Sequence, residues 1–234
     1  MAIDEARRDA RSAKEMTPFL QKALTPEGRR VFTGIYENLL ATSGHGRLTS
    51  VLVCSATTGE GATSIATGLA LAAAEKRKGP VLLIDGNLHN PQICQDFQVA
   101  GDTGLGNLLN GNNSVASVAA RQTAIPNLSV MGVGTVPADH IQALEPMKFR
   151  GLLETLALTY SFIVVDGPSV NAFPESLLYA PQVDRVLLVV SAGKTRVPVA
   201  AKALAKLTEV GCAHAEVILN RRTFVIPQAI YEKL

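Results

Sequence analysis

The chain lacks the patterns that assign many proteins to a class at sight. Its three cysteines, Cys54, Cys94 and Cys212, have no metal-type spacing, and two of them fall in apolar runs typical of strands. We expect reduced, buried thiols. An excess of one charge is also missing. The 22 basic and 20 acidic residues leave a net charge of +2, which is too balanced to indicate nucleic-acid binding by bulk electrostatics.

Signals for export and for crossing a membrane are absent as well. Met1 opens a charged segment without an apolar core, so the sequence predicts no signal peptide. The longest weakly polar run, residues 62–74, is too short and too rich in Thr, Ser and Gly to span a bilayer. We therefore expect a cytoplasmic protein with a flexible tail at residues 1–22 and one α/β domain at residues 23–234.

One stretch, Ser50–Lys78, organises the rest of the chain. An apolar run at Val51–Cys54 predicts a strand, Gly59 and Gly61 predict a turn, and an alanine-rich helix is expected to begin near Thr63. This order is typical of a phosphate-binding loop. Its glycines let successive backbone N–H groups close around phosphate oxygens at the positive end of a helix.

The same loop lacks its lysine. In the pattern (G/A)xxxxGK(S/T), Ala56 takes the first position, Gly61 the second glycine and Thr63 the hydroxyl that reaches Mg²⁺, but Ala62 stands at the lysine. No lysine lies between Ala23 and Glu75, so none in the loop replaces it. The sequence predicts a phosphate cradle without its charge, and hence weak binding of ATP or ADP with Mg²⁺.

The loop SATTGEGATS, Ser55–Ser64, resembles the SAxPGEGKST of the bacterial tyrosine kinases of capsule and exopolysaccharide assembly, which are related to the MinD and ParA ATPases. The resemblance extends over Arg29–Arg222. It implies a P-loop NTPase-like parallel sheet with helices on both faces, and a P-loop kinase-like domain over residues 23–234. The nucleotide-binding loop residues that it implies are Thr58, Gly59, Glu60, Gly61, Ala62, Thr63 and Ser64.

Two acidic motifs of the chain also resemble motifs of this family. The run LLIDGNLHNP resembles the family's LLIDADLRRP. This chain keeps the first aspartate as Asp85, but it has Asn87 in place of the second aspartate and His89 in place of the first arginine. The run SFIVVDGPSV resembles YDxVIIDTPPV and makes Asp166 the Walker B residue. The resemblance implies catalytic roles for Asp85, Asn87 and Asp166, and a metal site of Thr63, Asp85 and Asp166. Asparagine cannot take a proton, so the chemistry is altered here too.

Of three further family features, one is kept and two are changed or reduced. The run AEVILNR resembles GVVLNR, which makes Asn220 and Arg221 candidates near the adenine. The subunit-contact motif ExxRxxRTN has Arg30, Thr33 and Tyr36 at its charged positions, so we expect a monomer or small oligomer rather than a ring. Only Tyr231 remains of the family's C-terminal tyrosine cluster.

The remaining elements follow from hydrophobic periodicity. We expect further strands at Val81–Ile84, Asn127–Gly132, Ser161–Val165, Arg185–Ser191 and Ala215–Asn220. Helices are expected at Pro26–Leu40, Gly104–Gly111, Met147–Tyr160 and Pro198–Val210. Lys194, in the turn after a strand, is interpreted as a solvated residue rather than part of a second phosphate site.

Three functions remain open. The favoured one is a degenerate tyrosine-kinase-like subunit with a regulatory or scaffold role in exopolysaccharide or capsule biosynthesis. Such a subunit would sit at the inner membrane through the cytoplasmic part of a polysaccharide co-polymerase, possibly beside an active kinase homologue. The second is an active kinase or ATPase with its cation supplied from elsewhere, such as Lys76, Lys194 or a partner's arginine. The third is a MinD-like positioning ATPase.

Overall fold

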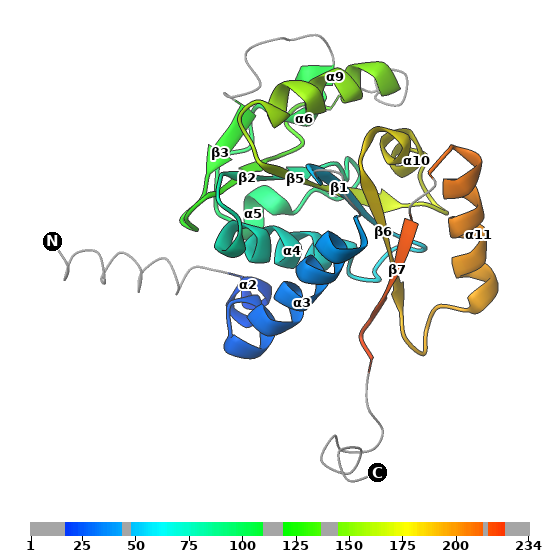
Figure 1. Ribbon diagram of the computed structural model, residues 1–234. Coiled ribbons are helices and arrows are strands. Elements are labelled where there is room, and N and C mark those ends of the chain that lie inside the picture. Colours follow the sequence, from blue (N-terminus) through cyan, green and yellow to red (C-terminus); the bar gives the residue numbers. More distant parts are fainter. Residues whose placement is uncertain (1–16, 44–47, 110–118, 137–144, 213–214, 223–234) are drawn as a thin grey trace, which may run out of the picture.

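The computed structural model describes residues 17–43, 48–109, 119–136, 145–212 and 215–222. In this part of the chain seven strands form one sheet in the order β3-β4-β2-β5-β1-β6-β7 (Figure 1). All neighbours pair in parallel except β3, which is antiparallel to β4. The strands are β1 (Ser50–Ser55), β2 (Val81–Asp85), β3 (Ala120–Gln122), β4 (Leu128–Met131), β5 (Phe162–Ser169), β6 (Arg185–Ser191) and β7 (Ala215–Asn220).

Helices cover both faces of the sheet, as the sequence predicted. The core on one face contains residues of α2 (Pro18–Ala23), α3 (Pro26–Thr42), α4 (Ala62–Lys76) and α5 (Ile93–Asp96). The core on the other face contains residues of α6 (Leu105–Leu109), α9 (Pro146–Ala157), α10 (Glu175–Tyr179) and α11 (Val197–Glu209). A short 3₁₀ helix, η1 (Ala180–Gln182), follows α10.

The central strands β1, β2 and β5 are buried along their whole length, and most of their residues are apolar, because both faces of the sheet are covered there. In β1, Val51 and Val53 belong to the core that contains α4, whereas Leu52 and Cys54 belong to the opposite core. This alternation is the period of two that a strand imposes on its side chains. The predicted strands at β1, β2, β4, β5, β6 and β7 are confirmed, with ends shifted by no more than a few residues.

Helix α4 lies between the sheet and α3, and its buried residues are mainly alanine and leucine. A Cβ added to Gly68 would lie 2.2 Å from the Phe32 ring of α3. The missing side chain therefore allows α3 to approach α4 closely. This packing fixes the helix whose first turn follows the glycine loop.

The N-terminal boundary differs from the prediction. Helix α2 begins at Pro18, Thr17 caps it by accepting a hydrogen bond from the Leu20 amide, and Leu20 is buried in the core. The expected tail at residues 1–22 is therefore wrong at its C-terminal end, since a single apolar side chain buried by tertiary contacts leaves little periodicity to detect. Residues 1–16 lie outside the described part.

Helix α3 is confirmed, although only part of its predicted apolar surface is buried. Tyr36 and Leu39 are buried, whereas Val31 is 59% exposed and Leu40 is 39% exposed. Tyr36 packs edge-on against Phe162 of β5. The residue at this position of the subunit-contact motif is thus used inside the subunit.

Strand β3 was not predicted. It is three residues long, and its side chains are half-buried or exposed, so no alternation distinguishes it from a loop. It pairs antiparallel with β4 at the edge of the sheet. Tyr231 lies outside the described residues.

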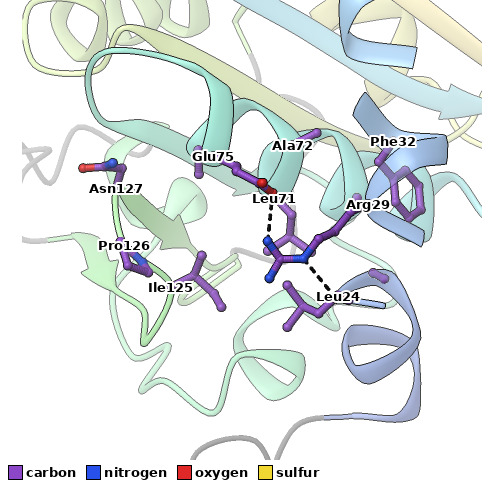
Figure 2. Close-up of a pocket in the computed structure, with 12 residues that line it drawn as sticks. Leu24, Arg29, Phe32, Leu71, Ala72, Glu75, Ile125, Pro126 and Asn127 are labelled. Atoms are coloured by element: carbon purple, nitrogen blue, oxygen red, sulfur yellow. Dashed lines mark hydrogen bonds and ion pairs between the residues drawn. The ribbon is translucent and has the colours of Figure 1, made fainter. Parts of the chain in front are cut away.

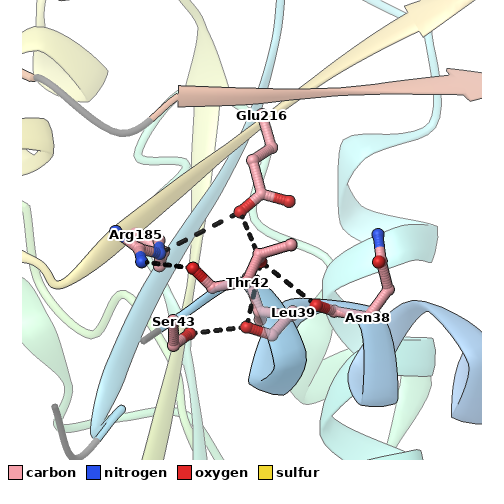
Figure 3. Close-up of polar contacts among 6 residues, drawn as sticks. All are labelled: Asn38, Leu39, Thr42, Ser43, Arg185 and Glu216. Atoms are coloured by element: carbon pink, nitrogen blue, oxygen red, sulfur yellow. Dashed lines mark hydrogen bonds and ion pairs between the residues drawn. The ribbon is translucent and has the colours of Figure 1, made fainter. Parts of the chain in front are cut away.

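Polar contacts tie the amino-terminal edge of the sheet together (Figure 3). Arg185, the first residue of β6, donates a hydrogen bond of 2.9 Å to the Thr42 carbonyl at the end of α3. The Thr42 hydroxyl donates to Glu216 of β7 at 3.0 Å, and Arg185 forms a longer ion pair with Glu216 at 3.9 Å. These contacts join α3 to the starts of two strands.

The sequence predicted reduced, buried thiols and no membrane-spanning segment. Cys54 and Cys212 are buried, Cys94 is half-buried, and none of the three forms a disulfide. Among the described residues, no helix combines the length and apolarity needed to cross a membrane.

Candidate functional site

The glycine loop runs from the end of β1 to the start of α4. Gly59 and Gly61 have φ angles of 79° and 92°, in the left-handed region that other residues adopt only with strain. Gly61 is the N-cap of α4, and Ala62 is the first helical residue. The loop is therefore arranged as the sequence predicted, with the helix N-terminus at its end.

Buried Glu60 fixes the shape of this loop. Its carboxylate accepts a hydrogen bond of 2.8 Å from the Thr57 amide and another from the Thr195 hydroxyl in the turn after β6. Its backbone carbonyl accepts one of 2.8 Å from the Asn220 amide group at the end of β7. Glu60 and Asn220, both predicted to bind nucleotide, thus hold the loop in place and do not line the cavity beside it.

That cavity has a volume of about 500 Å³ and lies at the carboxyl ends of the parallel strands. Parallel α/β sheets bind ligands at this edge. Most of the predicted loop residues line it, together with residues that follow β2, β5 and β7. The predicted residues that line the cavity are Thr58, Gly59, Gly61, Ala62, Thr63, Ser64, Asn87 and Arg221.

Ala62 presents only a methyl group to this cavity. No lysine or acidic side chain is found among the described residues that line it. Lys76 lies at the far end of α4 and Lys194 lies in the turn after β6, and neither lines the cavity. No lysine of the described chain therefore takes the place of the missing one.

The two predicted aspartates are buried behind the cavity rather than exposed in it. Asp85 of β2 and Asp166 of β5 pair in register on neighbouring strands, and each is 1% exposed. Burial raises the pKa of Asp85 to about 6, although its carboxylate accepts hydrogen bonds from three backbone amides, those of Asn87, Gln92 and Ile93. Asp85 thereby also caps the short helix α5.

Asp166 is less well compensated. Burial and the nearby Asp85 carboxylate raise the pKa of Asp166 well above its ordinary value, while a hydrogen bond from Thr63 lowers it. One of its carboxylate oxygens is buried and has no hydrogen-bond partner among the described residues. A buried carboxylate oxygen that lacks a donor beside a threonine hydroxyl fits a Mg²⁺ ion with its water shell.

Thr63, Asp85 and Asp166 would hold that ion. No group of three or more His, Cys, Asp or Glu side chains that could hold a metal occurs among the described residues. A bound Mg²⁺ would therefore take most of its ligands from water and phosphate, as this ion usually does with nucleotides.

Several cavity residues were not predicted as site residues. His89 donates to or accepts from buried Glu175 at 2.7 Å and stacks on Phe173, with ring centroids 3.8 Å apart. Ser169 lines the cavity, and its buried hydroxyl has no hydrogen-bond partner among the described residues. The stretch after each acidic motif carried this signal, because the chain beyond a strand's carboxyl end lines the ligand edge.

A second cavity of about 400 Å³ lies along the other half of α4, away from the glycine loop (Figure 2). It is mainly apolar, with Leu24, Phe32, Leu71 and Ile125 among its lining residues. The ion pair of Arg29 and Glu75, 3.0 Å apart, crosses its wall. None of the predicted site residues reaches it.

No family model matches the chain. The putative tyrosine-protein kinase CapB of Staphylococcus aureus is 27% identical over 190 residues, covering 81% of this chain and 82% of CapB. The kinase domain of VpsO is 31% identical with a TM-score of 0.72, covering 95% of this chain and 100% of that domain. The chimerical protein CapA2B2 is 25% identical with a TM-score of 0.77, covering 86% and 87%.

The wider fold is shared with nucleotide-binding ATPases. The septum site-determining protein MinD of Pyrococcus horikoshii, solved with Mg-ADP, is 22% identical with a TM-score of 0.63 and covers 79% of this chain. That likeness concerns the fold alone. The similarity extends over the whole VpsO kinase domain and most of CapB, and so the chain belongs to the bacterial tyrosine-kinase family of P-loop proteins.

Proposed function

We propose that this chain is a degenerate member of the family, which binds a nucleotide weakly and acts as a regulatory or scaffold subunit in exopolysaccharide or capsule biosynthesis. Its partner is the cytoplasmic part of a membrane polysaccharide co-polymerase, beside which an active kinase homologue can also sit. The likeness to the chimerical protein CapA2B2 supports a partner of this kind.

The observation that carries this proposal is Ala62. The loop around it is complete: Gly59 and Gly61 adopt left-handed angles, Glu60 is fixed by two donors, and α4 begins at the expected place. Only the side chain that would neutralise phosphate charge is missing. A charged hydrogen bond contributes about 1.5–3 kcal/mol, so affinity is about tenfold to a hundredfold weaker than with lysine.

Asn87 supports the same reading. Asn87 lines the cavity. Its amide can offer an oxygen to a hydrated ion but cannot accept a proton from an attacking hydroxyl. Phosphoryl transfer needs the metal, the cation and the orientation of the attacking group together. Two of these parts are altered here, which favours a binding role over catalysis.

The surface that forms the family's subunit contact is altered too. Arg30 is exposed on α3, Thr33 is half-buried, and Tyr36 is buried against Phe162 and accepts a hydrogen bond of 3.4 Å from Arg77. A buried tyrosine cannot pair with a neighbouring subunit's acid. A monomer or small oligomer is therefore proposed, and light scattering that shows a concentration-independent ring would contradict it.

A second candidate is an active kinase or ATPase that receives its cation from a partner. The residues that would hold Mg²⁺ support this second function, because Thr63, Asp85 and Asp166 are all present and lie together. Arginine fingers supplied in trans are common in phosphoryl transfer.

Two measurements on the full chain separate these functions. Calorimetric titration of ATP with and without Mg²⁺ should give weak binding, and affinity in the micromolar range or tighter contradicts the degenerate reading. In cells, deleting the gene should reduce exopolysaccharide, while Asp166→Ala should leave the polymer nearly unchanged. Loss of the polymer with a folded, abundant Asp166→Ala protein would replace the scaffold by the active enzyme.

A further inference from the structure

Arg221 adopts a strained backbone conformation beside the glycine-loop cavity. Its φ angle is 57°, and its amide donates a hydrogen bond of 2.8 Å to the Asn220 side-chain oxygen. Left-handed angles are uncommon for residues other than glycine, asparagine and aspartate, and the cost points to a local requirement. Of the described non-glycine residues with such angles, Arg221 is the one that lines this cavity.

Asn220 fastens this turn to the loop. Its amide nitrogen donates to the Glu60 carbonyl at 2.8 Å, and the same nitrogen would lie 2.5 Å from a Cβ placed on Gly61. The oxygen of the same side chain accepts from the Arg221 amide. Both polar atoms of Asn220 are thus engaged within the protein, and the side chain joins Arg221 to the glycine loop that lines the same cavity.

The cavity is suited to an anion and is short of positive charge. Among its described lining residues, Arg221 is the one with a permanent charge, and none is acidic. No hydrogen bond or ion pair joins its guanidinium to another described residue. The backbone amides of the loop and the start of α4 favour phosphate oxygens. Ser169, which is 3% exposed and lines the same cavity, has a hydroxyl without a partner in the described chain.

We propose that Arg221 supplies the charge that Ala62 lacks, by contacting the phosphate groups of a nucleoside di- or triphosphate, with Asn220 as its positioning residue. This inference rests on the proposed weak binding of nucleotide. It differs from the role near the adenine that the family resemblance implies for this arginine. A guanidinium donates paired hydrogen bonds to phosphate oxygens and remains charged at all working pH values.

The test is calorimetric titration with four probes: ATP, ADP, inorganic tripolyphosphate and adenosine. Arg221→Ala should weaken ATP and tripolyphosphate by a similar factor of about tenfold, since one charged contact is lost from each. Adenosine binding should not change. Arg221→Lys should recover part of the loss, and thermal unfolding of each variant shows that it is folded.

Arg196→Ala is the matched control. Arg196 is also an exposed arginine, at the N-cap of α11, and does not line the cavity. Its removal should leave the affinity for all four probes unchanged. An equal loss in both variants would mean that only the overall charge of the protein matters, and would overturn the proposal.

The same titrations in an Ala62→Lys background separate this inference from the proposed function. With a lysine present, removal of Arg221 should cost less than in the unmodified chain, because two cations then share the phosphates. If Arg221→Ala weakens ATP and adenosine but not tripolyphosphate, the arginine contacts the base and the proposal is wrong. If neither chain binds any probe, the proposed nucleotide binding fails together with it.

Discussion

The two edges of the sheet surround their carboxylates in opposite ways. At the carboxyl edge, Asp85 and Asp166 are buried side by side and form no ion pair with a basic side chain of the described chain, and the pKa of each is raised, mainly by burial. At the amino edge, Asp184 accepts four hydrogen bonds from the amides and hydroxyls of Thr49 and Ser50, between 2.8 and 3.1 Å. Partial burial alone would raise the pKa of Asp184, but these hydrogen bonds lower that pKa below its ordinary value.

This difference separates a binding edge from a structural edge. Asp184 and the nearby contacts of Arg185, Thr42 and Glu216 satisfy one another, so this edge gains stability on folding (Figure 3). Asp166 keeps a buried oxygen without a donor, which costs stability unless a ligand or ion completes it. Unsatisfied groups of this kind mark functional sites, where stability is given up for binding.

The largest expected effect comes from returning a cation to the carboxyl edge. Ala62→Lys should raise ATP affinity about tenfold to a hundredfold, because lysine adds a charged contact to phosphate beside Asp166. Calorimetry with Mg²⁺ measures it. Ala62→Met, which has a long side chain without charge, is the matched control, and an equal gain there would mean that packing rather than charge is responsible.

Catalysis should need a second repair. Ala62→Lys alone is expected to leave ATP hydrolysis and tyrosine phosphorylation low, since Asn87 still provides no proton acceptor, whereas Ala62→Lys with Asn87→Asp should raise both. A phosphate-release assay and phosphotyrosine detection would show this. Full activity in the single variant would mean that Asn87 is harmless.

The next effect removes the uncompensated charge. Asp166→Asn should increase the free energy of unfolding by about 1–3 kcal/mol near pH 8, because the amide replaces a carboxyl group whose charged form is disfavoured by burial. The folded pKa of Asp166 is raised, so its carboxyl stabilises fully below the unfolded value of 3.8, and that contribution is lost as pH rises through the folded pKa. The gain should therefore vanish below pH 3.8.

Urea unfolding of both proteins at the two pH values makes that comparison. If Asp166→Asn raised the free energy of unfolding equally at both pH values, the cause would be packing and not charge.

The smallest effect has the opposite sign and lies at the amino edge. Asp184→Asn should lower the free energy of unfolding by about 1 kcal/mol at neutral pH, because it loses charge-assisted hydrogen bonds. The folded pKa of Asp184 is lowered, so its contribution is present above 3.8 and is lost as pH falls through the folded pKa. The two proteins should converge in acid.

The control for this variant is Glu154→Gln, an exposed partner of Arg150 on α9. Surface pairs of this kind contribute little, so its stability should stay within experimental error of the original. A loss as large as that of Asp184→Asn would show that any acidic residue at the surface has the same effect.

The sequence by itself determined the strands and the loop. Buried parallel strands are continuous apolar runs, and Arg185–Ser191 was predicted with the bounds that the structure gives it. Ala215–Asn220, which is half-buried or exposed at the edge of the sheet, was also predicted with its observed bounds. The glycines at 59 and 61 predicted a turn, which the structure forms with left-handed angles at both, and Ala62 marked the missing charge. These are local signals, since each depends on residue types within one turn or strand.

Only the tertiary structure decided what the polar residues of the site contact. Asn220 is 160 residues from Glu60 in the sequence, yet it donates to the carbonyl of Glu60, and His89, 86 residues from Glu175, forms a hydrogen bond with the side chain of that first residue of α10. The burial of Leu20 and the pairing of β3 were equally hidden. Such contacts depend on which strands lie side by side, and hydrophobic periodicity contains no information on strand order.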